Sequence, residues 1–193
     1  MPRFSVQEKN RIQQLLIEEG ERLFVTYGIK KVTIDDIVKA VNIAKASFYK
    51  FYEGKEYLFL DIAQLRQKEI FDKLDLILAS NSDKEPRERV KELFFVMSQL
   101  MGEYLILVHI DLETIQIITR KVSSQRIADF TLQGFDAVKL LEQRGIKFKV
   151  ESKTVSCLFH TLYNSWISLK NQSNELKNQV ITIMLDGILG EIL

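Results

Sequence analysis

The side chains best suited to bind a partner molecule lie in one short stretch, at Lys45, Ser47, Tyr49 and Lys50. Ammonium and hydroxyl groups donate hydrogen bonds to phosphate oxygens and to acceptor atoms on base edges, so this set suits a nucleic acid. Two phenylalanines, Phe48 and Phe51, stand three residues apart within the stretch. This spacing predicts a short helix from about residue 44 to residue 51, with its aromatic rings facing inward.

The residues before this stretch have the pattern of another short helix. Thr33 is a good N-cap, and Asp35 and Asp36 place negative charge in the first turn, where the helix dipole favours it. Apolar residues then recur at helical spacing, at Ile34, Ile37, Val38 and Val41. Asn42 tolerates the left-handed backbone that a tight turn needs. Together the two helices predict a helix-turn-helix, whose second helix enters the major groove of DNA.

Positive charge is concentrated in this part of the chain. The whole chain has a net charge of +1, whereas residues 28–55 carry six lysines against three acidic residues. A basic cluster on the helices that contact DNA is typical of a site-specific binder. Taken without the motif, a lysine-rich surface indicates only solubility.

The segment resembles the DNA-binding domain of the TetR family of bacterial transcription regulators, over roughly residues 7–60. The resemblance is carried by Leu23-Phe24, Gly28, Thr33-Ile34-Asp35-Asp36-Ile37, Ser47-Phe48-Tyr49-Lys50-Phe51-Tyr52 and Lys55-Glu56. The chain departs from the family pattern at Asn42, where glycine is usual, and at Ala44, where a capping serine or threonine is common. Loss of that cap costs roughly 1 kcal/mol of local helix stability.

The resemblance implies an all-α fold of about nine helices. A three-helix DNA-binding domain at residues 1–54 is expected to precede a helical regulatory and dimerisation domain at residues 55–193. The expected function is that of a ligand-responsive repressor, which binds a palindromic operator in double-stranded DNA as a homodimer. Two recognition helices about one DNA turn apart, roughly 34 Å, would then contact the two halves of the operator.

Seven residues are expected to contact DNA. Thr33, Tyr49 and Lys55 match family positions that usually bind phosphates. At the start of the recognition helix, Lys45 can donate to guanine, Ala46 can touch a thymine methyl group and Ser47 can bond to several bases. Lys50 can serve a phosphate or a base.

Apolar periodicity predicts further helices at about 6–27, 55–79, 86–101, 124–144, 152–170 and 174–192, with shorter helical pieces between 103 and 121. By resemblance the last two helices pair across a two-fold axis, and the residues expected there are Val155, Leu158, Phe159, Leu162, Val180, Ile183, Met184 and Ile188. The alternative is that they complete a monomer core. An effector pocket for a largely apolar molecule is expected among Phe94, Met97, Met101, Tyr104, His109, Phe130, Tyr163 and Trp166. Such aromatic and methionine stripes also occur in ordinary cores.

Other chemistries find little support. The chain has one cysteine and two histidines, and the pair Cys157 and His160 lacks the further ligands that a zinc site needs. No phosphate-binding glycine loop or nucleophile motif is present, so we expect no enzyme activity, no cofactor and no metal. No apolar run is long enough to span a membrane, and we expect a cytoplasmic protein that is associated with the nucleoid when bound to DNA.

Two hypotheses of different classes remain. The favoured one is the ligand-responsive, DNA-binding repressor. The alternative is a helical ligand-binding or protein-interaction module whose helix-turn-helix has lost specific DNA recognition, as the missing cap at Ala44 and the near-neutral overall charge allow. Sequence-selective, salt-dependent DNA binding distinguishes the first from the second.

Overall fold

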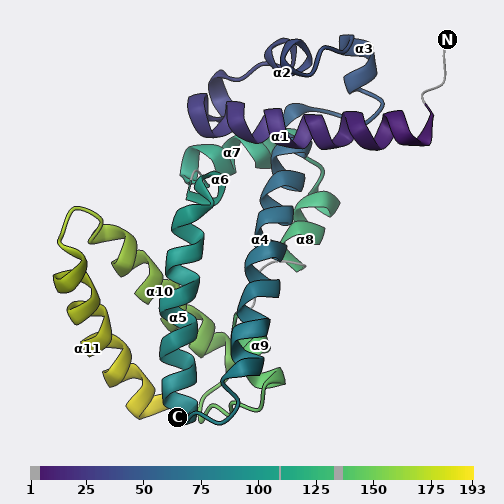
Figure 1. Cartoon of the computed structure of the whole chain (residues 1–193). Helices are drawn as coiled ribbons and strands as arrows, with labels where there is room; N and C mark the ends of the chain where they lie inside the picture. The colour runs from purple at the N-terminus through teal and green to yellow at the C-terminus, as the bar shows by residue number, and fades with distance from the viewer. Residues whose placement is uncertain (1–4, 109, 133–136) are drawn as a thin grey trace. The chain divides into compact units, whose positions relative to one another are not determined.

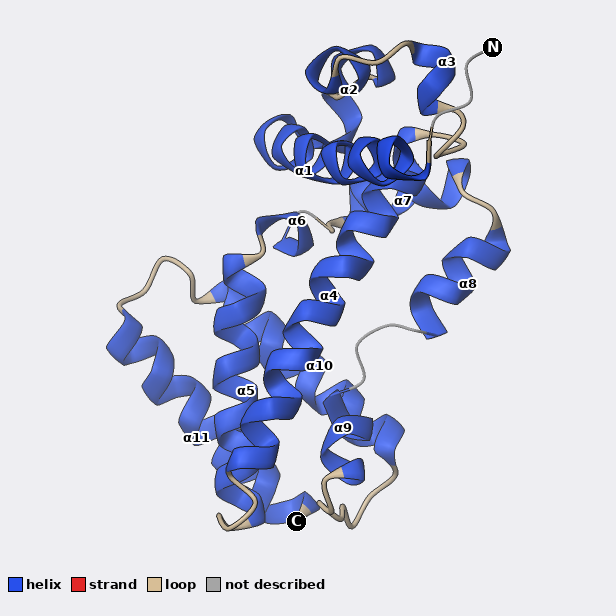
Figure 2. Cartoon of the chain, turned by 45° about the vertical axis from the view of Figure 1, so that its right-hand side comes forward, coloured by secondary structure: helices blue, strands red, loops and turns tan. Residues whose placement is uncertain are grey.

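The computed structural model describes residues 5–108, 110–132 and 137–193, and Figures 1 and 2 show that this part of the chain consists of helices and loops. Its eleven helices are α1 (Val6–Lys31), α2 (Ile34–Val41), α3 (Lys45–Phe48), α4 (Lys55–Ser80), α5 (Pro86–Glu103), α6 (Leu105–Val108), α7 (Leu112–Lys121), α8 (Ser124–Leu132), α9 (Ala137–Gln143), α10 (Ser152–Ser168) and α11 (Asn174–Ile192). The predicted all-α fold with an N-terminal helix-turn-helix is confirmed.

The described helices outnumber the predicted ones because two predicted regions each contain a pair. The shorter pieces expected between residues 103 and 121 are α6 and α7. The single helix expected over residues 124–144 corresponds to α8 and α9, and residues 133–136 between them lie outside the described part of the chain.

Local sequence determines both ends of α1. Ser5 and Glu8 form a capping box, in which the Ser5 side chain accepts a hydrogen bond from the Glu8 amide and the Glu8 carboxylate accepts one from the Ser5 amide. Gly28 has a φ of 77° and interrupts the helical backbone, which glycine does with little steric cost. The helical segment ends at Lys31, one turn beyond the predicted end at Tyr27.

The chain divides into two compact units, which we call unit 1 (Met1–Lys68 and Tyr104–Gly134) and unit 2 (Glu69–Glu103 and Phe135–Leu193). In unit 1, α1 packs on α2, α6 and α7, and α2 packs on α3. The expected domain boundary between residues 54 and 55 stays a prediction.

The core of unit 1 is built around a close approach of α1 and α4. Leu16, Ile37 and Leu58 are completely buried. A Cβ atom at Gly20 would lie only 2.9 Å from Leu58 Cδ2, so the absence of a side chain at this position is what lets the two helices approach.

In unit 2, α5 packs on α10 and α11, and α9 packs on α10. Phe94 and Phe159 are buried and meet edge to face, with ring centroids 6.4 Å apart. Arg87 and Lys91 on α5 both pair with Asp186 on α11. The described helices of this unit therefore share one apolar core with ion pairs at its surface.

Candidate functional site

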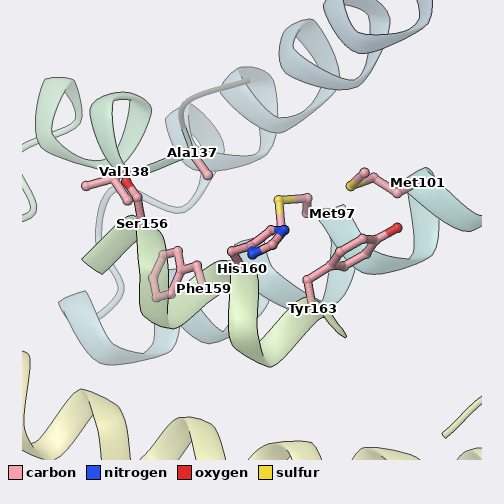
Figure 3. Close-up of a pocket in the computed structure, with 8 residues that line it drawn as sticks. All are labelled: Met97, Met101, Ala137, Val138, Ser156, Phe159, His160 and Tyr163. Atoms are coloured by element: carbon pink, nitrogen blue, oxygen red, sulfur yellow. The ribbon is translucent and has the colours of Figure 1, made fainter. Parts of the chain in front are cut away.

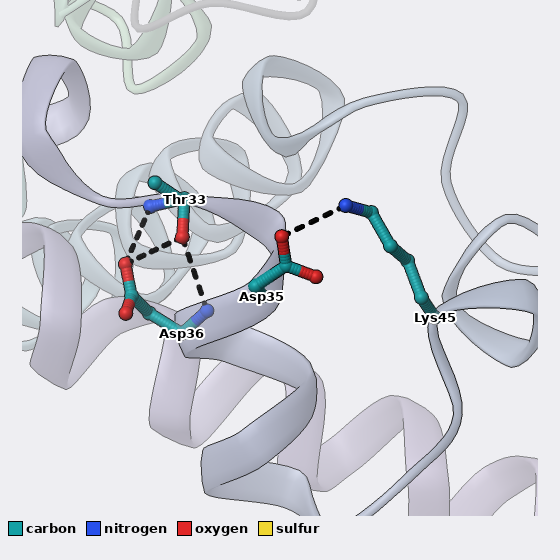
Figure 4. Close-up of polar contacts among 4 residues, drawn as sticks. All are labelled: Thr33, Asp35, Asp36 and Lys45. Atoms are coloured by element: carbon teal, nitrogen blue, oxygen red, sulfur yellow. Dashed lines mark hydrogen bonds and ion pairs between the residues drawn. The ribbon is translucent and has the colours of Figure 1, made fainter.

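The second helix of the motif begins with a complete capping box, shown in Figure 4. Thr33 Oγ1 accepts a hydrogen bond from the Asp36 amide at 3.2 Å and donates one to Asp36 Oδ2 at 2.6 Å. The Thr33 amide donates to the same carboxylate oxygen at 2.9 Å. These hydrogen bonds from Thr33 lower the pKa of Asp36. The Thr33 hydroxyl thus fixes the start of α2, and its expected contact with phosphate stays a prediction.

The turn between α2 and α3 has the geometry that Asn42 predicted. Asn42 adopts the left-handed conformation, with φ 58° and ψ 49°, and its backbone N–H donates to the carbonyls of Val38 and Lys39. Ala44 follows as the N-cap of α3 and makes no side-chain hydrogen bond. The recognition helix therefore begins without the cap that the family pattern usually supplies.

The recognition helix α3 is shorter than predicted. It was expected over residues 44–51, whereas the α-helix spans Lys45–Phe48. On either side, backbone hydrogen bonds between residues three apart replace the α-helical ones. The Ser47 amide donates to the Ala44 carbonyl at 2.8 Å, and the Phe51 amide donates to the Phe48 carbonyl at 2.9 Å. Such tight turns are common where a helix terminates, and here they leave only one α-helical turn.

Phe48 anchors α3 to the core of unit 1. Its side chain is completely buried, and its ring lies 5.9 Å from that of Tyr52, which is also buried. Tyr49 meets the same ring edge to face at 5.7 Å but keeps 53% of its surface exposed. This anchoring holds the Tyr49 hydroxyl at the surface, where a phosphate can reach it.

Lys45, the expected base-contacting residue, forms an ion pair across the motif. Its ammonium lies 2.8 Å from Asp35 Oδ2 on α2, as Figure 4 shows, and both side chains are at least half exposed. The hydrogen bond with Asp35 raises the pKa of Lys45. Ala46 and Lys50 are exposed and Ser47 is partly buried. The four expected recognition residues, Lys45 to Ser47 and Lys50, therefore lie on one short segment beside Asp35, which was expected only to favour the start of α2.

Lys55 has a structural role that the sequence did not indicate. Its ammonium donates to the carbonyl of Ile29 at 2.7 Å and to the carbonyl of Val32, in the turn where α1 ends. Carbonyls at a helix C-terminus lack intrahelical partners, and a lysine can supply them. Burial lowers the pKa of this lysine. Lys55 therefore joins the start of α4 to the end of α1, and its expected phosphate contact stays a prediction.

Unit 2 contains a cavity of about 180 Å³ between α5, α9 and α10, shown in Figure 3. Its lining residues are Met97, Met101, Ala137, Val138, Ser156, Phe159, His160 and Tyr163. Met97, Met101 and Tyr163 were among the residues expected to contact an effector. Ser156 and His160 were not among the expected pocket residues, although Ser156, Phe159, His160 and Tyr163 follow one another at the spacing of a single helix face.

The other expected pocket residues lie elsewhere. Phe94 packs against Phe95 and Phe159. Trp166 meets Phe95 edge to face and has the Lys177 ammonium 3.7 Å above its ring. Tyr104 and Phe130 belong to unit 1, and His109 lies outside the described residues.

The residues expected at a dimer interface divide into two groups. Val155, Phe159 and Leu162 are buried within unit 2 itself, and Leu158, Val180 and Ile188 are partly buried. Ile183 and Met184 on α11 are 66% and 36% exposed. Among the residues expected at the interface, Ile183 and Met184 thus present the largest exposed apolar surface.

Within the described part of the chain, no helix has the length and apolar character needed to cross a membrane. The same residues contain no cluster of three or more histidine, cysteine or acidic side chains that can hold a metal ion. Cys157 is exposed and is not joined in a disulfide.

Comparison with known proteins identifies the motif. Residues 16–62 match the family model described as "Bacterial regulatory proteins, tetR family". The uncharacterized HTH-type transcriptional regulator YhgD of Bacillus subtilis is 33% identical over 63 residues, which cover 33% of each chain. The probable acrEF/envCD operon repressor of Escherichia coli K12 is 26% identical over 96 residues, which are 50% of this chain and 43% of that protein. The aligned part thus spans less than half of either relative's length.

Solved structures extend the likeness of fold to nearly the whole chain. The fatty acid degradation regulator FadR of Bacillus halodurans matches with a TM-score of 0.60 and 12% identity, covering 96% of this chain and 95% of that one. A transcriptional regulator of Cytophaga hutchinsonii matches with a TM-score of 0.63 and 21% identity, covering 93% and 97%. Given this fold, the helix-turn-helix and the matched motif, the chain belongs to the TetR family of bacterial transcription regulators.

Proposed function

We propose that this regulator is a ligand-responsive repressor that binds a palindromic operator as a homodimer. The observation that carries the proposal is the anchoring of α3: Phe48 is completely buried, while Lys45, Ala46, Tyr49 and Lys50 are exposed around it. A short, rigidly held segment with donors on its outer side can enter the major groove and keep its register there.

The contacts divide by role. Tyr49 and Lys55, with Thr33, are proposed to bind phosphates, which fixes the position of the motif without selecting a sequence. Lys45, Ala46 and Ser47 are proposed to contact base edges, which selects the sequence. Lys50 serves one of these two roles. In this proposal the DNA-binding domain comprises residues 1–54, and residues 55–193 supply regulation and dimerisation.

Dimerisation is proposed to use α10 and α11. Leu176, Ile183 and Met184 on α11 and Ile167 on α10 are apolar yet at least 36% exposed. Exposed apolar surface of this kind is favourable to bury against a second copy. Two copies related by a two-fold axis would present two recognition helices to the two halves of a palindrome.

Regulation is proposed to act through the cavity of unit 2. A ligand can change DNA affinity only if it binds one arrangement of the two DNA-binding domains better than the other. The Escherichia coli relative is a probable operon repressor, which supports repression as the direction of control. As a regulator that meets chromosomal DNA, the protein is proposed to act in the cytoplasm, at the nucleoid.

The test is a selection of bound sequences from randomised duplex DNA, followed by titration of the selected site at several salt concentrations. We expect an enriched palindrome that binds with a Kd near ~10⁻⁸ M or tighter and at least ~10³-fold more tightly than random DNA. Absence of any enriched sequence, both with and without a metabolite extract, would overturn the proposal.

One observation favours a second candidate function. Ala44 leaves α3 without a side-chain cap, and only four residues of α3 are α-helical. A helix-turn-helix that no longer recognises a specific sequence would leave a helical ligand-binding or protein-interaction module. In the same titrations this module would bind random and selected DNA equally weakly.

A further inference from the structure

The described lining of the cavity of unit 2 is mainly apolar. Methionine, alanine, valine and phenylalanine side chains form most of this lining, and none of the lining residues that the structure describes is an aspartate, glutamate, lysine or arginine. The described lining residues offer an ammonium ion no carboxylate partner, whereas their apolar side chains favour an apolar body. The walls therefore favour a ligand with an apolar body and no positive charge.

The cavity is open to solvent at Ser156 and His160, so its volume sets the size of the part of the ligand that it encloses. At about 180 Å³ it is smaller than the pockets that hold drug-sized molecules, which start at roughly 300 Å³. In another protein, an apolar cavity of about 150 Å³ accommodates benzene. One ring with a short substituent is therefore the size that fits.

The side chains of the lining favour a ring over an alkyl chain. Phe159 and Tyr163 contribute aromatic faces from α10, and Met97 and Met101 contribute thioethers from α5. Aromatic rings pack favourably against other rings and against methionine sulfur. Figure 3 shows the rings of His160 and Tyr163 projecting from α10 toward the two methionines.

The polar groups of the lining can act as donors. The Asn164 side-chain amide lies 3.4 Å from His160 Nδ1. An amide nitrogen can only donate, so in the tautomer that accepts this contact at Nδ1 the Nε2 of His160 is a donor. Burial raises the pKa of Tyr163, so its hydroxyl stays protonated and can donate as well. Two donors without a carboxylate match a ligand that carries an acceptor.

We propose that this cavity binds a compact, single-ring aromatic molecule that carries a carbonyl or carboxylate, whose oxygen accepts hydrogen bonds from Tyr163 and His160. The proposal rests on the proposed function, in that such a molecule would be the effector. Binding would bridge α5, α9 and α10, and it would therefore stabilise the folded form of unit 2.

The test uses three ring compounds of matched size and the full-length protein without DNA. Acetophenone carries an acceptor, ethylbenzene carries neither donor nor acceptor, and 1-phenylethylamine carries a positive charge. Ligand-observed NMR titration should show acetophenone binding about tenfold more tightly than ethylbenzene, since hydrogen bonds of ordinary net strength give that order of gain. The amine should bind no better than ethylbenzene. Benzoate, as a fourth arm, distinguishes a carboxylate from a neutral carbonyl as the preferred acceptor.

The variant Tyr163→Phe keeps the ring and removes the hydroxyl, so it should abolish most of the preference for acetophenone. The matched control is Tyr27→Phe, which removes the hydroxyl of an exposed tyrosine in unit 1 and should leave the preference unchanged. Circular dichroism verifies that both variants fold. Equal binding of acetophenone and ethylbenzene, a preference that survives Tyr163→Phe, or no saturable binding of any compound would overturn the proposal. These measurements contain no DNA, so failure of the operator selection would contradict the repressor function and leave this result standing.

Discussion

Replacing Lys55 by methionine should destabilise unit 1, because the Lys55 ammonium holds the end of α1. Methionine retains most of the aliphatic length and removes the three N–H donors. The carbonyl of Ile29, which now accepts a hydrogen bond at 2.7 Å, and the carbonyl of Val32 would both lose a charged donor. The end of α1 would be left to water or to the fraying of its last turn.

The magnitude follows from the number and kind of bonds lost. A hydrogen bond to a charged group contributes roughly 1.5–3 kcal/mol. Two such bonds would exceed 3 kcal/mol, but the lysine is also penalised by the burial that lowers its pKa, and methionine avoids that penalty. We therefore expect a net loss of roughly 2 kcal/mol in the free energy of unfolding, about a 30-fold change in the folding equilibrium.

Urea denaturation followed by far-ultraviolet circular dichroism measures this loss. The control is Lys9→Met, which removes an exposed lysine of α1 and should change the free energy of unfolding by less than about 0.5 kcal/mol. A Lys55→Met protein that unfolds at the same urea concentration as the Lys9→Met protein would refute the capping role.

The same variant tests the proposed phosphate contact of Lys55. The third carbonyl near its ammonium, that of Lys30, lies at 3.5 Å and is at most weakly bonded, so one N–H remains available to a phosphate. On the selected operator, Lys55→Met should therefore lower the slope of log K against log salt by about one unit. An unchanged slope would limit Lys55 to its structural role.

Three further predictions concern unit 1 and α5. Lys45→Ala should weaken discrimination at one operator base pair by ~1–3 kcal/mol, which titration of all single-base variants of the operator measures. If the variant keeps the base preference of the unsubstituted protein, Lys45 does not contact a base. Burial raises the pKa of Tyr52 from 10.0 to about 12, so the stability that its neutral phenol contributes is complete below pH 10 and is lost as the pH rises toward 12. Tyr52→Phe should flatten the pH dependence of the urea midpoint in that window, and an unaltered dependence would show that another group is responsible. Gly20→Ile should lower the free energy of unfolding by roughly 1–3 kcal/mol, because the new side chain overpacks against Leu58. Gly102→Ala on α5 should not destabilise the protein, because a Cβ atom there meets no atom within 4 Å. Equal urea midpoints for the two variants would contradict the close-packing argument.

Features set by local sequence were predictable. The capping of α2 by Thr33, the left-handed turn at Asn42 and the break at Gly28 each depend on residues within one or two turns of one another. Short-range hydrogen bonds and steric limits on φ determine such features, and both can be inferred from residue types. Pro86 likewise stands at the first position of α5, as its missing N–H predicts.

Features set by tertiary contact were not predictable. The partner carbonyls of Lys55 lie 26 and 23 residues before it, and nothing in the local sequence indicates that α4 begins beside the end of α1. The length of α3 was overestimated because Phe48 and Phe51 have helical spacing, whereas the backbone around them closes into tight turns. Phe94 illustrates the same limit, because it was expected to line the pocket and instead packs against Phe95 and Phe159. Periodicity predicts that a side chain faces inward, but it does not decide whether that side chain packs in the core or lines a cavity.

The lysines of the DNA-binding motif show why charge composition alone is an incomplete guide to DNA affinity. Of the six lysines in residues 28–55, Lys45 pairs with Asp35, Lys30 pairs with Glu113, and Lys55 bonds to backbone carbonyls. These three ammonium groups are therefore less available to DNA than their number suggests, and Lys45 must leave Asp35 to place its ammonium against a base edge away from that carboxylate. A matching base edge can replace the hydrogen bond that Lys45 gives up when it leaves Asp35, whereas a non-matching base edge cannot. Intramolecular pairing therefore weakens binding to random DNA more than binding to the correct site, so a chain of net charge +1 can still discriminate strongly between sequences.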